Sequence, residues 1–391
     1  MKDHPDISNE ELLLPGLCRL SFTEEHTDRL KALAGTVADW KYFISLASGH
    51  GVAALAYYNL EKLGLLQHIP SETKDILRNT LMISLSRNTR NAETMTEVLG
   101  LMTRNNIKCV LLKGLALELM VYGNSGIRQM TDIDVLMTRE DCLKAMTILL
   151  DNGFNSFPLK SLFHRSIMSY IGKHLPTLSK DSFRIELHHE LFTSGNKELT
   201  RIFYDSSSEA EMNGEKAFLP EPQIFFLYLI KHLNMHEMNN ESQLRLYTDL
   251  VVLIEKYRED ILTDSLIWYA EKAGMREILA RKLGILRDFW DISLPDYLNE
   301  LILGYYDTAS FGKFIFFLKS PKDNPPLDQP GFYRNIIREI PGFHRKLLFI
   351  SGDLFPTLSF MKKRYRCAKG WHAIFFYPFR WGKLWYLIKK N

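Results

Sequence analysis

Two aspartates on either side of an isoleucine, Asp132 and Asp134, are the residues that most clearly suggest chemistry. In a strand, residues two apart point to the same side, about 6.6 Å from one another. Two carboxylates placed so, with Ile133 facing the other way, form a site for a hard cation such as Mg²⁺, which binds carboxylates together with substrate phosphates. A bare D-x-D pair is also common on solvent-facing strand edges, so the neighbouring residues must decide between these two interpretations.

Residues on both sides of the pair favour a phosphate site. Upstream, an apolar run ends in Lys113-Gly114 before a predicted helix, where glycine lets a ligand approach the backbone and the helix N–H groups can bind phosphate. Arg128 adds a permanent cation with geometry suited to phosphate. Downstream, Glu186 and His188 share one face of another alternating segment, which makes Glu186 a candidate third carboxylate. The order of phosphate cradle, paired acids and third acid predicts a metal-dependent phosphate site.

Short strands alternating with helices are expected to position these side chains. Strands are predicted at 107–112, 132–137, 174–179 and 182–188, with helices at 115–122 and 139–151. Before residue 105 and after residue 221, apolar residues recur at helical spacing. The prediction is an α+β fold in which a small mixed-sheet core is flanked by N-terminal and C-terminal helical regions.

Four regions follow from this pattern. They are an N-terminal helical region at 1–105, an α/β core at 106–195, a helical domain at 196–320, and a connector with a C-terminal segment at 321–391. Four prolines mark the connector, namely Pro321, Pro325, Pro326 and Pro330.

Composition excludes several classes of protein. The 391 residues are 46% hydrophobic and 24% charged, an ordinary globular mixture that rules out disorder or collagen as a description of the whole chain. The four cysteines are scattered without a C-x-x-C pair, which argues against a disulfide scaffold or structural zinc and favours a reducing compartment. No apolar run approaches the roughly 18–20 residues that cross a bilayer. We expect a cytoplasmic protein.

Charge is unevenly distributed along the chain. Residues 362–391 contain nine Lys/Arg and no Asp/Glu, so taking these nine from the net charge of +3 leaves the preceding residues at −6. The segment is also rich in aromatic residues. Such a mixture suits an anionic membrane surface or a nucleic acid, whereas packing of the aromatics onto the protein itself is the ordinary alternative. Pro378 and Gly382 predict that no single continuous amphipathic helix forms here.

Longer motifs around the candidate site resemble a known family. The segments Leu111–Ala116, Tyr122–Leu136 and Ile185–His188 are similar to the uncharacterised bacterial nucleotidyltransferase family of the DNA polymerase beta-type superfamily. Members of that family carry L-K-G-x-A, a tyrosine-glycine loop, R-P-M-x-D-I-D-L-L-V and h-D-L-H-W. This chain has Gln129 in place of the proline, Glu186 in place of the last aspartate and His189 in place of the tryptophan. Looser likeness extends the resemblance over most of the chain.

The resemblance implies transfer of a nucleoside monophosphate from a nucleoside triphosphate such as ATP to a hydroxyl group. Asp132, Asp134 and Glu186 would be the catalytic residues and would bind one or two Mg²⁺ ions, with Mn²⁺ as an alternative. Nucleotide binding would fall to Lys113, Gly114, Arg128 and His188. The acceptor, whether small molecule, protein, peptide or RNA, is not indicated.

Some alternatives stay open on the sequence alone. A glycosyltransferase also uses D-x-D with a nucleotide sugar, and a non-catalytic protein could bind a nucleotide or a partner through the same residues. His232, Arg245 and Asp249, on predicted C-terminal helices, either form the far wall of the cleft or make an ion pair between helices.

Overall fold

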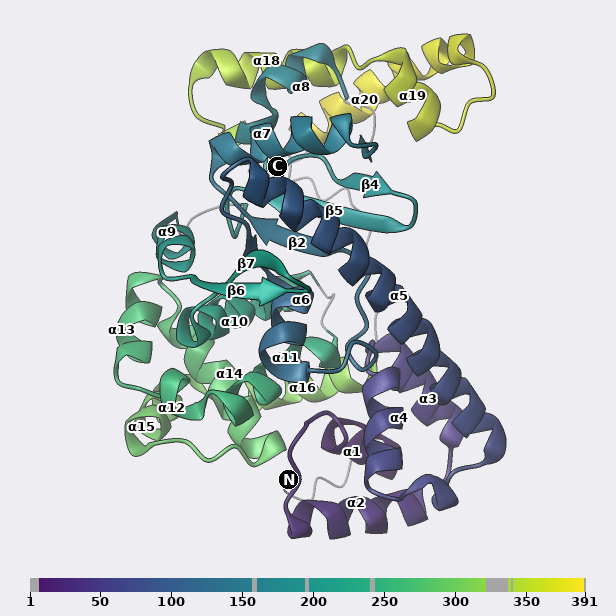
Figure 1. The fold of residues 1–391 in the computed structure, drawn as a ribbon, viewed down its shortest axis with the longest axis vertical. Coiled ribbons are helices and arrows are strands. Elements are labelled where there is room, and N and C mark those ends of the chain that lie inside the picture. The colour runs from purple at the N-terminus through teal and green to yellow at the C-terminus, as the bar shows by residue number, and fades with distance from the viewer. Residues whose placement is uncertain are drawn as a thin grey trace.

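The computed structural model describes residues 7–156, 160–193, 197–239, 243–320, 337–338 and 340–389. Within these ranges one mixed sheet has seven strands in the order β3-β4-β5-β2-β1-β7-β6. Its strands are β1 (Val110–Leu111), β2 (Ile133–Leu136), β3 (Asn155–Ser156), β4 (Leu178–Lys180), β5 (Phe183–His188), β6 (Ser208–Met212) and β7 (Glu215–Leu219). Together with the flanking helices, this sheet confirms the predicted α+β class (Figure 1). The proline-rich connector lies outside the described residues.

Two central strands, β2 and β5, run parallel to each other and form where they are predicted. β1 pairs antiparallel with β2 on its other side. Ile133, Val135, Ile185 and Leu187 are buried, as alternating apolar residues require. The strand predicted from residue 174 begins only at Leu178, because Pro176 has no N–H to donate to a ladder.

The sheet continues beyond residue 195, into the region predicted to be helical. β6 and β7 form a hairpin, and β7 pairs in parallel with β1. The turn between them is Asn213-Gly214, with φ of 51° and 85°, the left-handed pair that a tight hairpin turn requires. Four of the ten residues in these two short strands are charged, so their apolar signal is weak. The boundary of the α/β core therefore moves from residue 195 to the end of β7.

Helices surround the sheet on both sides. The N-terminal helices are α1 (Asn9–Gly16), α2 (Glu24–Thr36), α3 (Trp40–Gly49), α4 (Ala53–Lys62) and the 34-residue α5 (Ser71–Arg104). Those within the core are α6 (Lys113–Leu117), α7 (Arg139–Asp151), α8 (Leu162–Ile167) and α9 (Lys197–Asp205). The C-terminal half contains α10 (Pro222–Met238), α11 (Leu244–Lys256), α12 (Arg258–Ile261), α13 (Ser265–Lys272), α14 (Arg276–Trp290), α15 (Asp296–Tyr305) and α16 (Thr308–Lys319).

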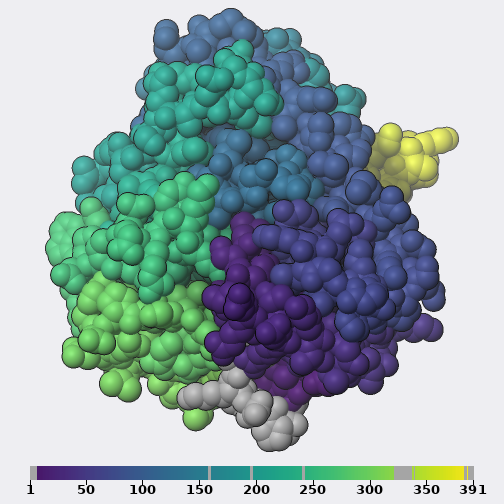
Figure 2. Space-filling model, turned by 60° about the horizontal axis from the view of Figure 1, so that its bottom comes forward, coloured from purple at the N-terminus to yellow at the C-terminus, as the bar shows by residue number. Residues whose placement is uncertain are grey.

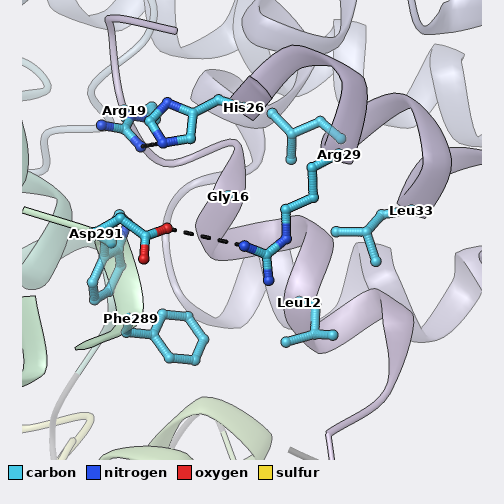
Figure 3. Close-up of a pocket in the computed structure, with 10 residues that line it drawn as sticks. Leu12, Gly16, Arg19, His26, Arg29, Leu33, Phe289 and Asp291 are labelled. Carbon is cyan, nitrogen blue, oxygen red and sulfur yellow. Dashed lines mark hydrogen bonds and ion pairs between the residues drawn. The ribbon is translucent and has the colours of Figure 1, made fainter. Parts of the chain in front are cut away.

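The N-terminal helices pack against the C-terminal half, as Figure 2 shows for the two surfaces side by side. Trp290 donates its indole N–H to the carbonyl of Pro15, and Arg19 bonds Glu255 at 2.6 Å. A small pocket lies at this junction, where Arg29 faces Asp291 at 3.9 Å (Figure 3). Its volume of about 30 Å³ holds little more than a water molecule, so we interpret it as a packing gap.

The end of the chain forms a separate unit at one end of the molecule (Figure 1). It comprises α18 (Phe343–Leu354), α19 (Leu358–Arg364), a 3₁₀ segment at Gly370–Phe375 and α20 (Phe376–Lys389). A small core of Ile167, Ile340 and Phe349 joins α18 to α8. As predicted, the described part of the basic segment is not one continuous helix, since α19, the 3₁₀ segment and α20 divide it. The breaks do not fall at Pro378 and Gly382, however: α20 runs through both, because Pro378 lies in the first turn, where its missing N–H would be unpaired in any case. No helix in the described ranges is both long enough and apolar enough to cross a membrane.

Candidate active site

The register of β2 on β5 brings the central acids together. Asp134 is the direct partner of Glu186, and Leu136 is the partner of His188. Residues paired across parallel strands point to the same face, so the carboxylates of Asp134 and Glu186 are neighbours although 51 residues separate them. Two segments that are far apart in sequence thus form one acidic site.

His188 joins the two carboxylates. Its Nε2 lies 2.7 Å from Asp134 Oδ1 and 3.4 Å from Glu186 Oε2. One candidate ligand atom from each of the three residues falls within 4.8 Å of the others. The imidazole is fully buried, and its Nδ1 has no hydrogen-bond partner among the described residues. The same Nε2 can donate to Asp134 or, once deprotonated, bind a metal ion.

Lys113 forms an ion pair with Asp134. Its Nζ lies 2.7 Å from Asp134 Oδ1, the same oxygen that His188 contacts. Lys113 has a φ of 46°, in the left-handed region that non-glycine residues seldom adopt, which costs on the order of 1 kcal/mol. This backbone conformation occurs where β1 gives way to α6, so the ammonium group is held at the end of the strand beside the acids.

Electrostatics keep this cluster charged. Burial alone would raise the pKa of Asp134, but Lys113 and the hydrogen bond from His188 hold it well below its ordinary value. Burial would likewise lower the pKa of Lys113, yet Tyr228 and Asp134 raise it overall. For Glu186, burial is outweighed by the hydrogen bond from His188 and the charge of His174, so its pKa is also lowered. Both carboxylates are therefore ionised at neutral pH.

A cavity of about 220 Å³ opens in front of Lys113 and Asp134. The core contributes Lys113, Gly114, Arg128, Met130, Thr131, Asp132 and Asp134, and helices α10 and α11 contribute Leu229, His232, His236, Arg245, Leu246 and Asp249. The cavity lies between the sheet core and the C-terminal helices, where a substrate can reach residues of both.

Asp132 and Gly114 are placed at this cavity in different ways. Asp132 precedes β2, is exposed, and accepts a hydrogen bond from Thr131 at 3.0 Å, outside the three-residue cluster found among the described residues. Gly114 lies beneath Arg128 and Met130: an added Cβ would come within 2.7 Å of Met130 Sδ. Glycine is therefore needed here for packing as well as for access to the backbone.

Arg128 is engaged by a carboxylate from α11. Its Nε and Nη2 donate to the two oxygens of Asp249 at 2.8 and 2.7 Å, and Tyr122 donates to the same carboxylate at 2.9 Å. Both members of the ion pair are buried. The pair links the core to the C-terminal helices. Two nitrogens of the guanidinium, which the sequence predicts to bind phosphate, are thus bonded to Asp249. The third, Nη1, lies close to Gly114.

The comparison with protein families agrees with this arrangement. A family model described as uncharacterised nucleotidyltransferase matches residues 36–291, which include every element of the cavity. The chain belongs to this family. Its members are nucleotidyltransferases, and the chain is accordingly an enzyme of that class. No curated protein matches it. Among solved structures, the crystal structure of an antigenic nucleotidyltransferase-like protein from Paracoccidioides brasiliensis is similar, with 14% identity over 57% of this chain and 96% of that chain, at a TM-score of 0.32.

The far wall of this nucleotidyltransferase cavity contains uncharged histidines. Burial and the nearby Lys113 lower the pKa of His232 well below its ordinary value and that of His236 to about 4. Arg245 donates to the carbonyl of Gln129 at 2.7 Å, while its Nε has no partner among the described residues. His232, Arg245 and Asp249 therefore all line the cleft. Asp249 also forms an ion pair, with the core and not with another helix.

Two residues beside Glu186 were not anticipated from the sequence. His174 Nε2 lies 3.5 Å from Glu186 Oε2, and Thr177 donates to Glu186 Oε1 at 3.2 Å. The neighbouring Lys173 also faces the acidic cluster, where burial and the charge of Lys113 lower its pKa to about 8. These residues lie in the irregular segment before β4, which no motif marks. An isolated bridge between His174 and His188 brings that segment to the site.

Proposed function

We propose that the protein transfers a nucleoside monophosphate from a nucleoside triphosphate to a hydroxyl-bearing acceptor, as the DNA polymerase beta-type enzymes that its motifs resemble do. The observation that carries this proposal is the joint placement of Asp134, Glu186 and His188 beside Lys113, at a cavity large enough for part of a nucleotide. Family membership supports transfer of a nucleotide, and the site residues give it a chemical basis.

The donor set fits a divalent metal ion. Carboxylates suit Mg²⁺ and Mn²⁺, and imidazole suits transition metals, so Asp134, Glu186 and His188 would hold such an ion. Asp132, exposed at the cavity mouth, would contribute when substrate is bound. When present, the ion would offset the negative charge of the triphosphate and of the departing pyrophosphate.

The side chains of the protein have separable roles in this proposal. Glu186 is ionised and held by His174 and Thr177, so it can accept the proton from the attacking hydroxyl. Lys113 would bind a phosphate oxygen in exchange for part of its contact with Asp134. The first backbone N–H groups of α6 lie at the same place and add donors to phosphate.

Arg128 acts indirectly in this scheme. Because Asp249 binds two of its nitrogens, it positions α11 against the core and contributes at most Nη1 toward phosphate. The neutral His232 and His236, with Arg245, would contact the base or the acceptor, since they line the wall opposite the acids.

Transfer of a labelled nucleotide tests this function directly. Purified protein would be incubated with Mg²⁺, cell lysate as the acceptor pool, and each of the four nucleoside triphosphates labelled at the α-phosphate. We expect label to move to acceptor with the wild type and not with Asp134→Asn/Glu186→Gln. The control Glu140→Gln/Asp151→Asn removes two exposed acids of α7 and should retain activity.

Two results would contradict the proposal. Equal labelling by the wild type and by the Asp134→Asn/Glu186→Gln variant would show that these two acids are not required for catalysis. Absence of labelling, together with no Mg²⁺-dependent binding of any triphosphate, would refute nucleotidyl transfer at this site, and glycosyl transfer from a nucleotide sugar would then be the activity to assay.

A further inference from the structure

The C-terminal unit at residues 343–389 displays aromatic side chains to solvent. Among the side chains that the structure describes in this unit, six aromatics are each more than half exposed: Phe343, Phe355, Trp371, Phe375, Phe379 and Trp385. Exposed aliphatic side chains such as Leu347 and Ile374 accompany them. Isolated apolar residues on a surface are normal, but an accumulation of this kind in one small unit indicates a site of interaction.

The same unit is uniformly basic. Beyond Asp353 the chain has nine Lys/Arg and no acidic residue. Asp353 itself is fully buried and paired with Lys160 and Arg380, so it contributes no negative charge to the surface. Lys362, Lys363 and Lys369 are exposed. The exposed aromatics thus belong to a unit whose exposed charged side chains are basic.

The aromatic residues are exposed although the unit is firmly anchored. Trp381 donates its indole N–H to the carbonyl of Leu354 at 2.7 Å, and Arg380 donates to the carbonyl of Asp353 at 3.0 Å. These bonds fix α20 against α18, while Phe375 and Phe379 remain 73% and 65% exposed. The packing of the unit therefore leaves these side chains available to a partner.

We propose that the C-terminal unit docks on the surface of a lipid bilayer rich in anionic phospholipids. Lysine and arginine are attracted to anionic headgroups, and aromatic rings are favoured at the boundary between headgroups and hydrocarbon. Aliphatic side chains such as Leu347 and Ile374 gain by entering the hydrocarbon. A single-stranded nucleic acid would account for the cations and the aromatic rings, since bases stack on rings, but not for the exposed aliphatics.

This docking lies outside the region shared with the family. The family match ends at residue 291, and Figure 1 places α18, α19 and α20 at the end of the molecule beyond β4 and β5. In Figure 2 the C-terminal end projects from the side of the body. The unit can therefore contact a surface without rearrangement of the cavity. The proposed docking on a membrane goes beyond nucleotidyl transfer and does not depend on that activity.

Flotation with lipid vesicles tests the proposal. Full-length protein would be mixed with phosphatidylcholine vesicles with and without phosphatidylglycerol. We expect roughly tenfold stronger binding when the anionic lipid is present, weakened by added salt. Phe375→Ser/Phe379→Ser and Lys362→Glu/Lys363→Glu should each lower binding to anionic vesicles by roughly tenfold. Circular dichroism would confirm that both variants are folded.

Matched controls distinguish docking through this unit from nonspecific adsorption to vesicles. Leu303→Ser/Phe316→Ser removes two exposed apolar residues outside the unit, and Lys41→Glu/Arg87→Glu reverses two exposed charges outside it; neither should alter binding. The proposal would be overturned by absence of binding to anionic vesicles, by equal binding to neutral vesicles, or by wild-type binding in both C-terminal variants. It would also be overturned by retention of single-stranded RNA, and not of vesicles, by the same residues. Self-association abolished by these substitutions, without vesicle binding, would reassign the surface to a second copy of the chain.

Discussion

Asp134 of β2 and Glu186 of β5 are direct partners in a parallel register, and His188 lies within 3.4 Å of both carboxylates. This relationship makes a site from two strands that are distant in sequence. It also separates the two members of the D-x-D pair: Asp134 is buried within the cluster, whereas Asp132 is exposed at the edge of the cavity. The two aspartates should therefore respond differently to substitution.

Replacing Asp134 should weaken metal binding more than replacing Asp132. We expect Asp134→Asn to lower the affinity for Mn²⁺, measured by electron paramagnetic resonance, by roughly 100-fold, since a ligand is removed from the cluster. Asp132→Asn should lower it by roughly tenfold or less in the absence of nucleotide, because its carboxylate lies outside the cluster. An equal loss in the two variants would show that the D-x-D pair binds the ion as a unit. Circular dichroism would confirm that both variants are folded.

Breaking the Arg128–Asp249 pair should destabilise the protein. Removing one member leaves the other buried and charged, so Arg128→Ala and Asp249→Ala should each reduce the free energy of unfolding by about 3–5 kcal/mol. Replacing both, as Arg128→Met/Asp249→Leu, should cost less than the sum of the single substitutions, which denaturant titration of the four proteins would measure. If Arg128→Ala instead raised the KM for nucleotide without changing stability, Arg128 would be a phosphate ligand.

A side chain at Gly114 should disturb the site by crowding. In Gly114→Ala the new methyl group would meet Met130 and the Arg128 guanidinium, and overpacking of this kind costs about 1–3 kcal/mol. Because Arg128 and Met130 line the cavity, we expect the rate of nucleotidyl transfer to fall more than thermal stability does. The control Gly304→Ala places a methyl group on α15 with no atom within 4 Å, and it should leave both unchanged. Wild-type activity in Gly114→Ala would show that Arg128 and Met130 can shift to accommodate the methyl group without loss of catalysis.

The central strands and most of the candidate residues could be predicted because their signals are local. Apolar alternation marks β5, and the D-x-D pair and Lys113-Gly114 stand at the ends of short apolar runs. The partners of these residues could not be predicted. Asp249 lies 121 residues from the Arg128 that it binds, and no spacing rule connects α11 to a loop of the core. Arg128 was consequently assigned to phosphate.

Other differences have equally specific causes. The strands of the β6–β7 hairpin are short and half polar, and the clearest local signal is Asn213-Gly214, a dipeptide typical of tight hairpins. His174 and Thr177 reach Glu186 because irregular chain folds back on β5, which composition does not reveal. His188 contacts the two acids because its strand lies beside β2, and its predicted role in nucleotide binding stays a prediction. Contacts that depend on strand register and long-range packing are therefore the ones that the sequence could not predict.

Acid should destabilise the protein through His50, which is far from the acidic cluster in sequence. His50 is buried, donates from Nε2 to the carbonyl of Leu318 at 2.9 Å, and accepts at Nδ1 from the backbone N–H of Leu244 at 3.2 Å. The bond from Leu244 requires the neutral ring, because a protonated Nδ1 could no longer accept it. Burial lowers the pKa of His50 although the bond to Leu318 opposes the shift. A folded-state pKa below the unfolded value of about 6.5 means that its stabilising effect is complete above that pH and is lost progressively below it.

The expected result is a free energy of unfolding that decreases as the pH falls below about 6.5, and less steeply in His50→Gln than in the wild type. Glutamine can keep one of the two hydrogen bonds, so this variant should lose about 1–3 kcal/mol at neutral pH and then vary less with acid. Urea titrations between neutral and mildly acidic pH would measure both effects. The control His344→Gln replaces an exposed histidine of α18 and should retain the wild-type slope. A His50→Gln slope equal to that of the wild type would mean that other buried groups account for the acid sensitivity.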